Sequence, residues 1–297
     1  MTDTQINAFL AVAYFGNFTK AANSLFISEP ALSRSINLLE KEIGCTLIER
    51  KKGGRIQTLT TQGKHFLQIA ERWKILLEES KELSNSNTSE VLRISATESF
   101  SNYLLPPVYD SYLTSRPASR LMIDTYHTQE LHSQIIHNSC DIALVSYLSN
   151  SKHIESTELF REKIVIICPV GMFSKPEIHP SDLDASQEIL SSWAPDYQAW
   201  GEFWFGSDLQ TRIYLRTLSQ VPHFILQYHM WTFMPVSVAN YFASRYPLAV
   251  HNILNGPPDR ICYALQNRLY YHTDSDLIIS LIREEASKIE GITLSTS

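Results

Sequence analysis

The sequence has few cysteines and lacks the short motifs that mark common catalytic sites. Its four cysteines, Cys45, Cys140, Cys168 and Cys262, lie far apart and form no C-x-x-C pair. This excludes a disulfide framework or a zinc ribbon and indicates a reducing compartment. The chain contains no G-x-G-x-x-G, G-x-x-x-x-G-K-[ST], G-x-S-x-G or H-E-x-x-H pattern. We therefore expect no cofactor and no enzymatic activity.

Long hydrophobic runs and metal-ligand spacings are also missing. No stretch approaches the 18 or so apolar residues that a membrane-spanning helix needs, and the first residues lack the basic region of a secretory signal. His127, His132 and His137 are five residues apart, which does not stack two ligands on one helix face. We expect no metal site, no membrane partner and a cytoplasmic location.

The charge is small in total but unevenly distributed. The 297 residues are 44% hydrophobic and 19% charged, which suits a globular protein of two or three domains. The formal net charge is −6, yet residues 1–66 hold eight Lys and Arg against five Asp and Glu, so they carry +3 and leave −9 for the remainder. The basic charge is confined to the N-terminal segment, and the rest of the chain is acidic. This distribution favours nucleic-acid binding by that segment alone.

The first 45 residues predict three helices. Thr2 and Gln5 have the spacing of a capping box, and the first helix closes near Gly16. A short helix over about 19–25 follows, and Ser28 is the expected N-cap of a third helix over 29–43. On that helix a buried stripe is expected for Leu32, Ile36, Leu39 and Ile43, opposite a small, polar and basic face. This pattern is typical of a helix-turn-helix, although an ordinary solvated face remains the alternative.

A basic hairpin is expected directly after these helices. Residues 46–48 and 56–59 have strand character, and the turn between them is rich in Arg, Lys and Gly. Such a hairpin is a wing that reaches the DNA backbone or minor groove. The residues predicted to contact DNA are Ser28, Pro30, Ser33, Arg34 and Asn37 on the helix, and Arg50, Lys51, Lys52 and Arg55 on the hairpin.

This segment resembles the LysR-type transcriptional regulators. The resemblance rests on about 40 residues in order, which are Ala22-x-x-Leu25-x-x-Ser28-x-Pro30-Ala31-x-Ser33-Arg34-x-Ile36, Leu39-Glu40-x-x-Ile43-Gly44-x-x-Leu47-Ile48-x-Arg50 and Leu59-Thr60-x-x-Gly63. Two positions depart from the family pattern. Glu29 replaces a common Gln, which puts one base contact in doubt, and Ile48 replaces the usual Phe.

A long helix is expected over about 61–83, before a polar hinge that ends near residue 90. Phe66, Ile69, Trp73, Leu76, Ser80 and Leu83 follow a heptad spacing. The helix could lie on its own chain, whereas the resemblance implies an antiparallel helix pair that makes a dimer, or a dimer of dimers. We therefore divide the chain into a winged helix-turn-helix domain (1–60), a linker helix and hinge (61–90) and an effector-binding domain (91–297).

Residues 91–297 alternate strand and helix patterns, which predicts an α/β fold with largely parallel sheets. Strands are expected over 91–96, 120–126, 141–146, 163–169, 188–192, 212–216, 231–236, 248–252 and 260–266. Helices are expected over 102–114, 129–138, 196–205, 218–230, 237–245 and 274–290. The resemblance implies two periplasmic-binding-protein-like lobes, lobe I near 91–160 and 265–297 and lobe II near 161–264.

A small-molecule effector is expected in the cleft between these lobes, at the carboxyl ends of strands. Hydroxyl groups beside a helix start suit an anion, although helix capping explains them equally well. Dense aromatic residues near 193–205 and 231 point to an aromatic or apolar ligand if they line the cleft, and to a core if they do not. The candidate effector residues are Thr97, Ser99, Phe100, Ser146, Ser192, Trp193 and Trp231.

Three functions compete at this point. The first is a regulator that binds a pseudo-palindromic promoter as a dimer or tetramer, with double-stranded DNA, an effector and RNA polymerase as partners. The second is a solute-binding protein, against which the absent signal and the basic N-terminal segment argue. The third is an enzyme joined to a DNA-binding segment, for which no catalytic pair of residues is seen. The effector's identity, the target genes and the choice between activation and repression stay open.

Overall fold

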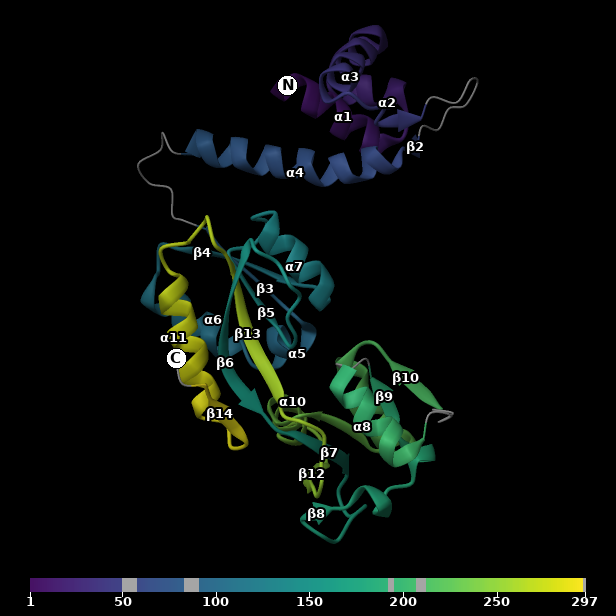
Figure 1. The fold of residues 1–297 in the computed structure, drawn as a ribbon, viewed down its shortest axis with the longest axis vertical. Helices are drawn as coiled ribbons and strands as arrows, with labels where there is room; N and C mark the ends of the chain where they lie inside the picture. Colours follow the sequence, from purple (N-terminus) through teal and green to yellow (C-terminus); the bar gives the residue numbers. More distant parts are fainter. Residues whose placement is uncertain (50–57, 83–90, 192–194, 207–211, 296–297) are drawn as a thin grey trace. The chain divides into compact units, whose positions relative to one another are not determined.

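The computed structural model describes residues 1–49, 58–82, 91–191, 195–206 and 212–295. The chain divides into two compact units, Met1–Thr88 and Ser89–Ser297 (Figure 1). Each unit has its own hydrophobic core.

Three helices of the N-terminal unit match the expected ones. They are α1 (Asp3–Phe15), α2 (Phe18–Ser24) and α3 (Glu29–Ile43). Thr2 and Gln5 form the predicted capping box of α1, which ends at Gly16 in the left-handed conformation. Ser28 caps α3 through its side chain. The short strands β1 (Ile48–Glu49) and β2 (Thr58–Leu59) then pair antiparallel before α4 (Thr61–Glu82).

The long helix α4 does not present its predicted stripe on one uniform surface. Phe66 is buried in the core of its own unit, where its ring packs edge-on to Phe9 with 5.1 Å between the ring centroids, and Trp73 packs against the same core. Ile69 and Leu76 are instead 50% and 48% exposed. The heptad spacing predicts that these residues lie on one side of the helix. It does not predict which of them pack on the core of their own unit and which stay exposed, because neighbouring positions on that side can face different partners.

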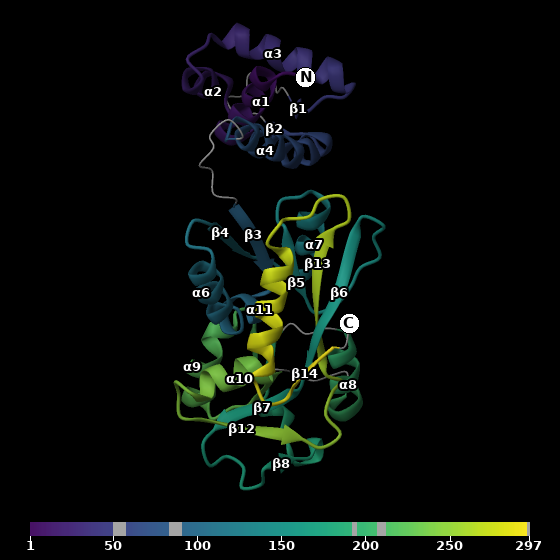
Figure 2. The same cartoon turned by 90° about the vertical axis from the view of Figure 1, so that its left-hand side faces the viewer.

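The larger sheet of the C-terminal unit has six strands in the order β14-β6-β13-β5-β3-β4 (Figures 1 and 2). These strands are β3 (Val91–Ala96), β4 (Arg120–Thr125), β5 (Ile142–Val145), β6 (Ile154–Glu162), β13 (Arg260–Asn267) and β14 (Ile292–Leu294). Only the pairings of β3 with β4 and β5 are parallel, because β13 returns antiparallel between β5 and β6, and β14 pairs antiparallel with β6. The expectation of largely parallel sheets was therefore wrong.

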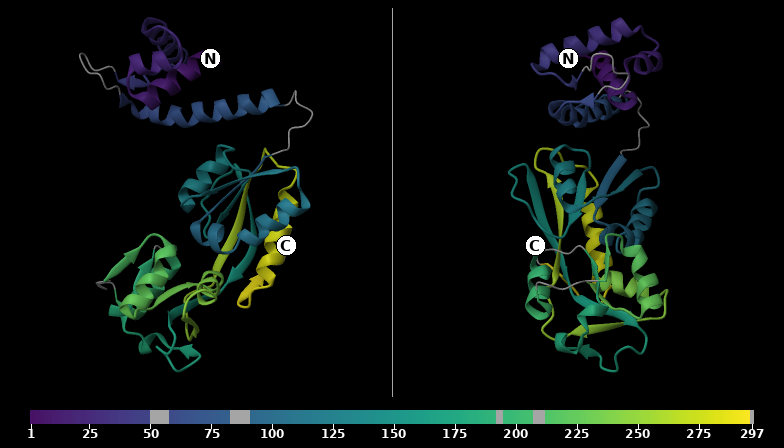
Figure 3. Two further views of the ribbon diagram at one scale, coloured as in Figure 1. Left: turned by 180° about the vertical axis from the view of Figure 1, so that it is seen from behind. Right: turned by 90° about the vertical axis from the view of Figure 1, so that its right-hand side faces the viewer.

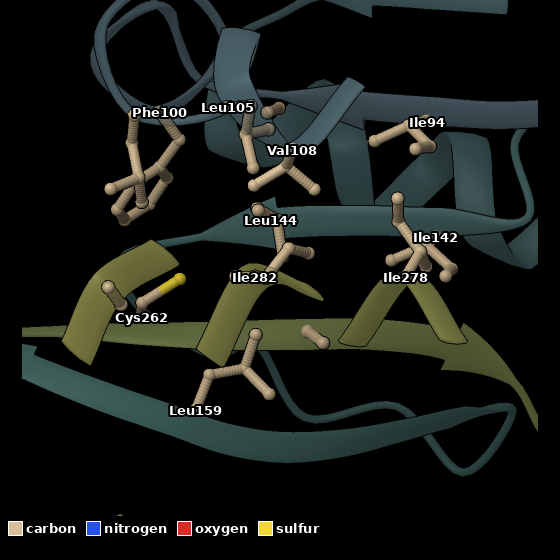
Figure 4. Close-up of a cluster of buried hydrophobic side chains, with 14 of the residues drawn as sticks. Ile94, Phe100, Leu105, Val108, Ile142, Leu144, Leu159, Cys262, Ile278 and Ile282 are labelled. Carbon is tan, nitrogen blue, oxygen red and sulfur yellow. The ribbon is translucent and has the colours of Figure 1, made fainter. Parts of the chain in front are cut away.

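Helices cover both faces of this sheet. One face packs on α5 (Glu98–Tyr103), α6 (Pro106–Ser115) and α11 (Ser275–Ser287), and the other on α7 (Thr128–Ile136). Strand β5 shows why, since Ile142 and Leu144 enter the first core (Figure 4), while Ala143 and Val145 enter the second. The helix expected over 102–114 is broken in two, because Pro106 and Pro107 cannot continue α5.

The smaller sheet has four strands in the order β11-β7-β12-β8. These are β7 (Ile164–Pro169), β8 (Glu177–Ile178), β11 (Thr232–Pro235) and β12 (Leu248–Ile253). The helices α9 (Val221–Tyr228) and α10 (Val236–Ala243) pack on one face, and the aromatic-rich α8 (Pro195–Phe205) on the other. A separate parallel pair, β9 (Ile189–Ser191) and β10 (Ile213–Leu215), lies beside α8 (Figure 3).

The chain passes between the two sheets at two places. After β6 it enters β7 through Lys163 alone, and it returns at Arg260, where β13 begins. Because all of β6 and β13 belong to the six-stranded sheet, the chain passes from one lobe to the other near residues 163 and 259. The sequence predicted these lobe boundaries near residues 160 and 265. Strand β6 was missed because most of its side chains are polar or half exposed.

Candidate functional site

The outward face of α3 carries the polar and basic side chains that the sequence placed there. Ser28, Pro30, Arg34 and Asn37 are exposed and Ser33 is half-buried, while the opposite side packs into the core of the N-terminal unit. Ile43 departs from the expected stripe and is 37% exposed, because it lies in the last turn before Gly44. This face offers hydroxyl, amide and guanidinium donors to a major groove.

The departure at Glu29 has a local consequence at the start of α3. The Thr19 hydroxyl donates to a Glu29 carboxylate oxygen at 2.8 Å, which links α2 to α3. A carboxylate also complements the positive end of the helix dipole. Glu29 therefore ties α2 to α3.

The base of the hairpin is held by a side chain of α3 and by the residue that precedes α4. A Glu40 carboxylate oxygen accepts the backbone N–H groups of Leu47 and Ile48 at 2.7 and 3.1 Å. The Thr60 hydroxyl donates to the Thr46 carbonyl at 2.8 Å and accepts the Gly63 N–H at 2.9 Å. Both ends of the wing are thus fixed on the unit's core. The predicted contacts Arg50, Lys51, Lys52 and Arg55 lie outside the described residues.

A large cavity of about 1000 Å³ lies in the C-terminal unit between the two sheets. The carboxyl ends of the parallel strands β3, β4 and β5 open on it, as do the ends of β9 and β10. Its volume is at the upper end of ordinary small-molecule sites. Parallel strand ends are the expected position of a ligand in an open α/β sheet.

Three of the candidate effector residues line this cavity. Thr97, Ser99 and Ser146 are in its wall, and Ser191 lies opposite on the smaller lobe. The hydroxyls of Thr97 and Ser99 are 3.3 Å apart, and Thr97 makes no side-chain cap to α5. Capping therefore does not account for the Thr97 hydroxyl, which shares a hydrogen bond with the Ser99 hydroxyl in the cavity wall.

Two candidate residues lie in cores instead. Phe100 is fully buried among the residues that join α5 to the large sheet (Figure 4). Trp231 is also fully buried, and its indole N–H donates to the Asp184 carbonyl at 3.1 Å. Placing them in the cleft was wrong, because Phe100 lies on the side of α5 that packs on the large sheet, and Trp231 packs in the aromatic cluster beneath α8. Ser192 and Trp193 lie outside the described residues.

Charged residues in the cavity wall escaped the sequence analysis, which searched for hydroxyls. Arg260 donates to Ser99 at 2.6 Å and to the buried Glu162 at 2.8 Å, and its guanidinium lies 4.1 Å from the centroid of the Phe100 ring. Arg161 pairs with Glu158 at 2.8 Å. Arg216 also lines the cavity and makes no ion pair within the part of the chain that the structure describes. Its place at the carboxyl end of the strand predicted over 212–216 was the signal that could have found it.

Glu98 joins the two lobes across the cavity. Its carboxylate oxygens accept the Leu218 N–H at 3.1 and 3.2 Å, at the start of the short 3-10 helix Leu218–Gln220 that leads into α9. A carboxylate from the larger lobe thus satisfies a free N–H at a helix start of the smaller lobe.

Two buried cysteines and one buried glutamate of the C-terminal unit have raised pKa values. Burial raises the pKa of Cys140 and of Cys168 to about 12, which keeps both thiols protonated and unreactive. Burial also raises the pKa of Glu188 to about 7, although a hydrogen bond from the Tyr197 hydroxyl at 3.1 Å works in the opposite direction. Tyr197 belongs to the cavity wall and shares its aromatic cluster with Trp231.

Among the described residues, no helix is long and apolar enough to cross a membrane. Within the same residues, no group of three or more His, Cys, Asp or Glu side chains is arranged to hold a metal ion.

Comparison with known proteins identifies both parts of the chain. Residues 4–64 match the bacterial regulatory helix-turn-helix protein model of the lysR family, and residues 85–286 match the LysR substrate binding domain. A probable RuBisCO transcriptional regulator of Thalassiosira pseudonana is 32% identical over 189 residues, which cover 60% of this chain and 61% of the relative. The HTH-type transcriptional regulator CitR of Bacillus subtilis (strain 168) is 29% identical over 201 residues, covering 65% and 67%.

Solved structures agree on the fold. A full-length variant of OxyR from Pseudomonas aeruginosa has a TM-score of 0.70 at 18% identity and covers 100% of this chain and 99% of its own. Full-length CbnR in complex with its target DNA has a TM-score of 0.71 at 20% identity and covers 96% and 100%. With both domain models matched in order, the chain belongs to the LysR family of DNA-binding transcriptional regulators, which are not enzymes, and carries the family's effector-binding domain.

Proposed function

We propose that the chain binds a pseudo-palindromic promoter site as a dimer or a dimer of dimers, with α3 in the major groove. The observation that carries this is the outward face of α3, where Ser33, Arg34 and Asn37 lie on a helix whose other side is fixed in the core. Arg34 and Asn37 suit guanine and adenine edges, and the hairpin cations suit phosphates. CbnR, a structural neighbour, has been solved with its target DNA. Such a protein acts in the cytoplasm, with RNA polymerase as a further partner.

The oligomer is supported by the unpartnered side of α4. Ile69 and Leu76 are about half exposed, seven residues apart, and so lie on one side of the helix. A second copy of α4 would cover them, which is the arrangement that places two α3 helices on two half-sites.

Arg34→Ala is expected to reduce discrimination between sites. One lost base contact should weaken binding to the preferred duplex by about 1–3 kcal/mol and leave non-specific binding nearly unchanged. Lys52→Ala should instead weaken all sequences alike and lower the slope of log affinity against log salt by about 0.9. Fluorescence anisotropy with a duplex selected by the wild-type chain, at several salt concentrations, measures both. Lys288→Ala, an exposed change in the C-terminal unit, is the control, and equal effects of Arg34→Ala on all duplexes would contradict the assignment.

We further propose that the effector is a small anion, aromatic or aliphatic, bound in the cavity of the C-terminal unit. Arg216 supplies the cation, and the hydroxyls of Thr97, Ser99 and Ser146 supply donors around it. Tyr197 supplies an aromatic wall, a role that the buried Trp231 does not have.

A panel of small mono- and dicarboxylates tests this assignment by thermal shift on the full chain. A binding carboxylate should raise the melting temperature of the C-terminal unit in proportion to the logarithm of its concentration above Kd. Arg216→Ala should abolish that shift, whereas Arg245→Ala should keep it, because Arg245 stacks on Tyr241 outside the cavity. Equal stabilisation by the uncharged amide of the same acid would overturn the anionic assignment.

A further inference from the structure

The turn between α2 and α3 contains a phenylalanine in a backbone conformation that favours glycine. After α2, the Ile27 N–H bonds the Ala22 carbonyl at 3.0 Å and the Phe26 N–H bonds the Asn23 carbonyl at 3.2 Å. These two bonds define a Schellman motif, whose central residue must be left-handed. Phe26 occupies that position with φ of +57°.

Phe26 is unusual among the residues that share this conformation. The other non-glycine residues with positive φ in the described chain are Asn138, His229 and Asn255, and Asn and His tolerate the left-handed region. Phe26 is the one apolar residue in this set, and its bulky side chain adds strain that Gly or Asn would avoid.

The phenyl ring of Phe26 does not pack in the core of the N-terminal unit. Leu25 and Ile27, on either side, pack against the buried cluster of the N-terminal unit. Phe26 points away from it and is 96% exposed. Since neither the backbone nor the core favours this side chain, its apolar surface is suited to a contact outside the chain.

The position of Phe26 indicates what that contact is. It precedes Ser28, the N-cap of α3, by two residues, so their Cα atoms lie within about 8 Å. The exposed residues of α2 and of the start of α3 include Thr19, Lys20, Ser28, Glu29 and Pro30, which are mostly polar and carry one charge of each sign. Such surroundings match a DNA groove wall, with phosphates for the cation and sugars or thymine methyls for an apolar ring.

We propose that the Phe26 ring makes an apolar contact with DNA beside the N-terminus of α3, and that the strained turn holds it there. This inference rests on the proposed function, in which α3 enters the major groove. The occupant is DNA, and a protein partner such as RNA polymerase is an outcome that the test can reveal.

The test compares Phe26→Asn with the wild type in the full chain. Asn accepts the left-handed conformation and removes the ring, so the melting temperature of the N-terminal unit should rise, by about 4 °C. Affinity for a duplex selected by the wild-type chain should nevertheless fall about tenfold. Phe26→Leu keeps an apolar group and should retain most of the affinity. Leu269→Asn, at a residue 90% exposed in the C-terminal unit, is the matched control and should change neither quantity.

Replacing thymines of the duplex one at a time with deoxyuridine separates the two apolar sources in DNA. If deoxyuridine at one position lowers the affinity of the wild type but not that of Phe26→Asn, the ring contacts the thymine methyl group at that position. If no replacement changes the affinity of the wild type, the ring contacts a sugar. Unchanged affinity of Phe26→Asn overturns the proposal, and if transcription in vitro is then impaired, the ring binds a protein. Failure of the wild-type chain to bind any duplex would overturn the proposed function itself.

Discussion

Glu162→Ala is expected to destabilise the C-terminal unit by about 3–5 kcal/mol, because it leaves a buried cation without its partner. Glu162 is fully buried, and the Arg260 side chain is 9% exposed. One Glu162 carboxylate oxygen accepts from Arg260, and the other accepts the Ser237 hydroxyl at 2.7 Å. For a unit of this size, the melting temperature should fall by roughly 10 °C, as measured by circular dichroism.

Two further variants test whether the loss of stability comes from the buried ion pair itself and not from the removal of any charge. Glu158→Ala breaks the exposed pair with Arg161 on the same strand and should change the melting temperature little. Combining Glu162→Leu with Arg260→Met removes both charges and should restore most of the stability, with Ser237 still lacking an acceptor. If Glu162→Ala melts like the wild type, the pair does not stabilise the fold.

The pair also matters for function, because it lies where both chain crossings between the lobes meet. Glu162 ends β6 directly before Lys163, and Arg260 begins β13. Ser237 belongs to α10 of the smaller lobe, and Arg260 also donates to Ser99 in the cavity wall. A loss of this pair should therefore loosen the lobes and weaken any ligand bound between them.

Gly63→Ala is expected to destabilise the N-terminal unit by about 2 kcal/mol or more. A Cβ at this position would lie 2.0 Å from the carbonyl oxygen of Leu47, which is backbone and fully buried. That oxygen also accepts the Thr60 N–H at 3.0 Å, so it cannot move without breaking the junction between hairpin and α4. Overpacking costs of about 1–3 kcal/mol exceed the gain of about 1 kcal/mol in helix propensity.

Gly201→Ala provides the matched control. Gly201 lies inside α8, and apart from its chain neighbours and the adjacent backbone of the helix no atom lies within 4 Å of an added Cβ. The same change should therefore stabilise its helix by up to about 1 kcal/mol. Urea unfolding followed by far-UV circular dichroism compares the two. Gly63→Ala should also abolish DNA binding while leaving carboxylate binding intact. Equal and stabilising effects at both glycines would contradict the close approach at Gly63.

The N-terminal helices were predictable because their signals are local. Capping by Thr2 and Ser28, the left-handed Gly16 and the two-faced pattern of α3 all act within a few residues. The order of motifs over residues 22–63 likewise identified the family, and the domain models agree.

The C-terminal unit was predictable in its elements and less so in their assembly. Most strands were placed within one or two residues, but β6, β8 and β14 were missed. The sheets are mixed, since pairing partners such as Glu162 and Arg260 are nearly 100 residues apart. Local periodicity carries no information on which distant strands meet.

The sequence alone therefore determined the class of the protein, the helix that we propose to face DNA and the loops that end at the cleft. Only the tertiary structure decided which side chains are available there: Thr97, Ser99 and Arg216 line the cavity, whereas Phe100 and Trp231 are buried. The physical reason is that residue type and spacing specify the local conformation of the backbone. Burial and charge pairing depend instead on neighbours that come from distant parts of the chain.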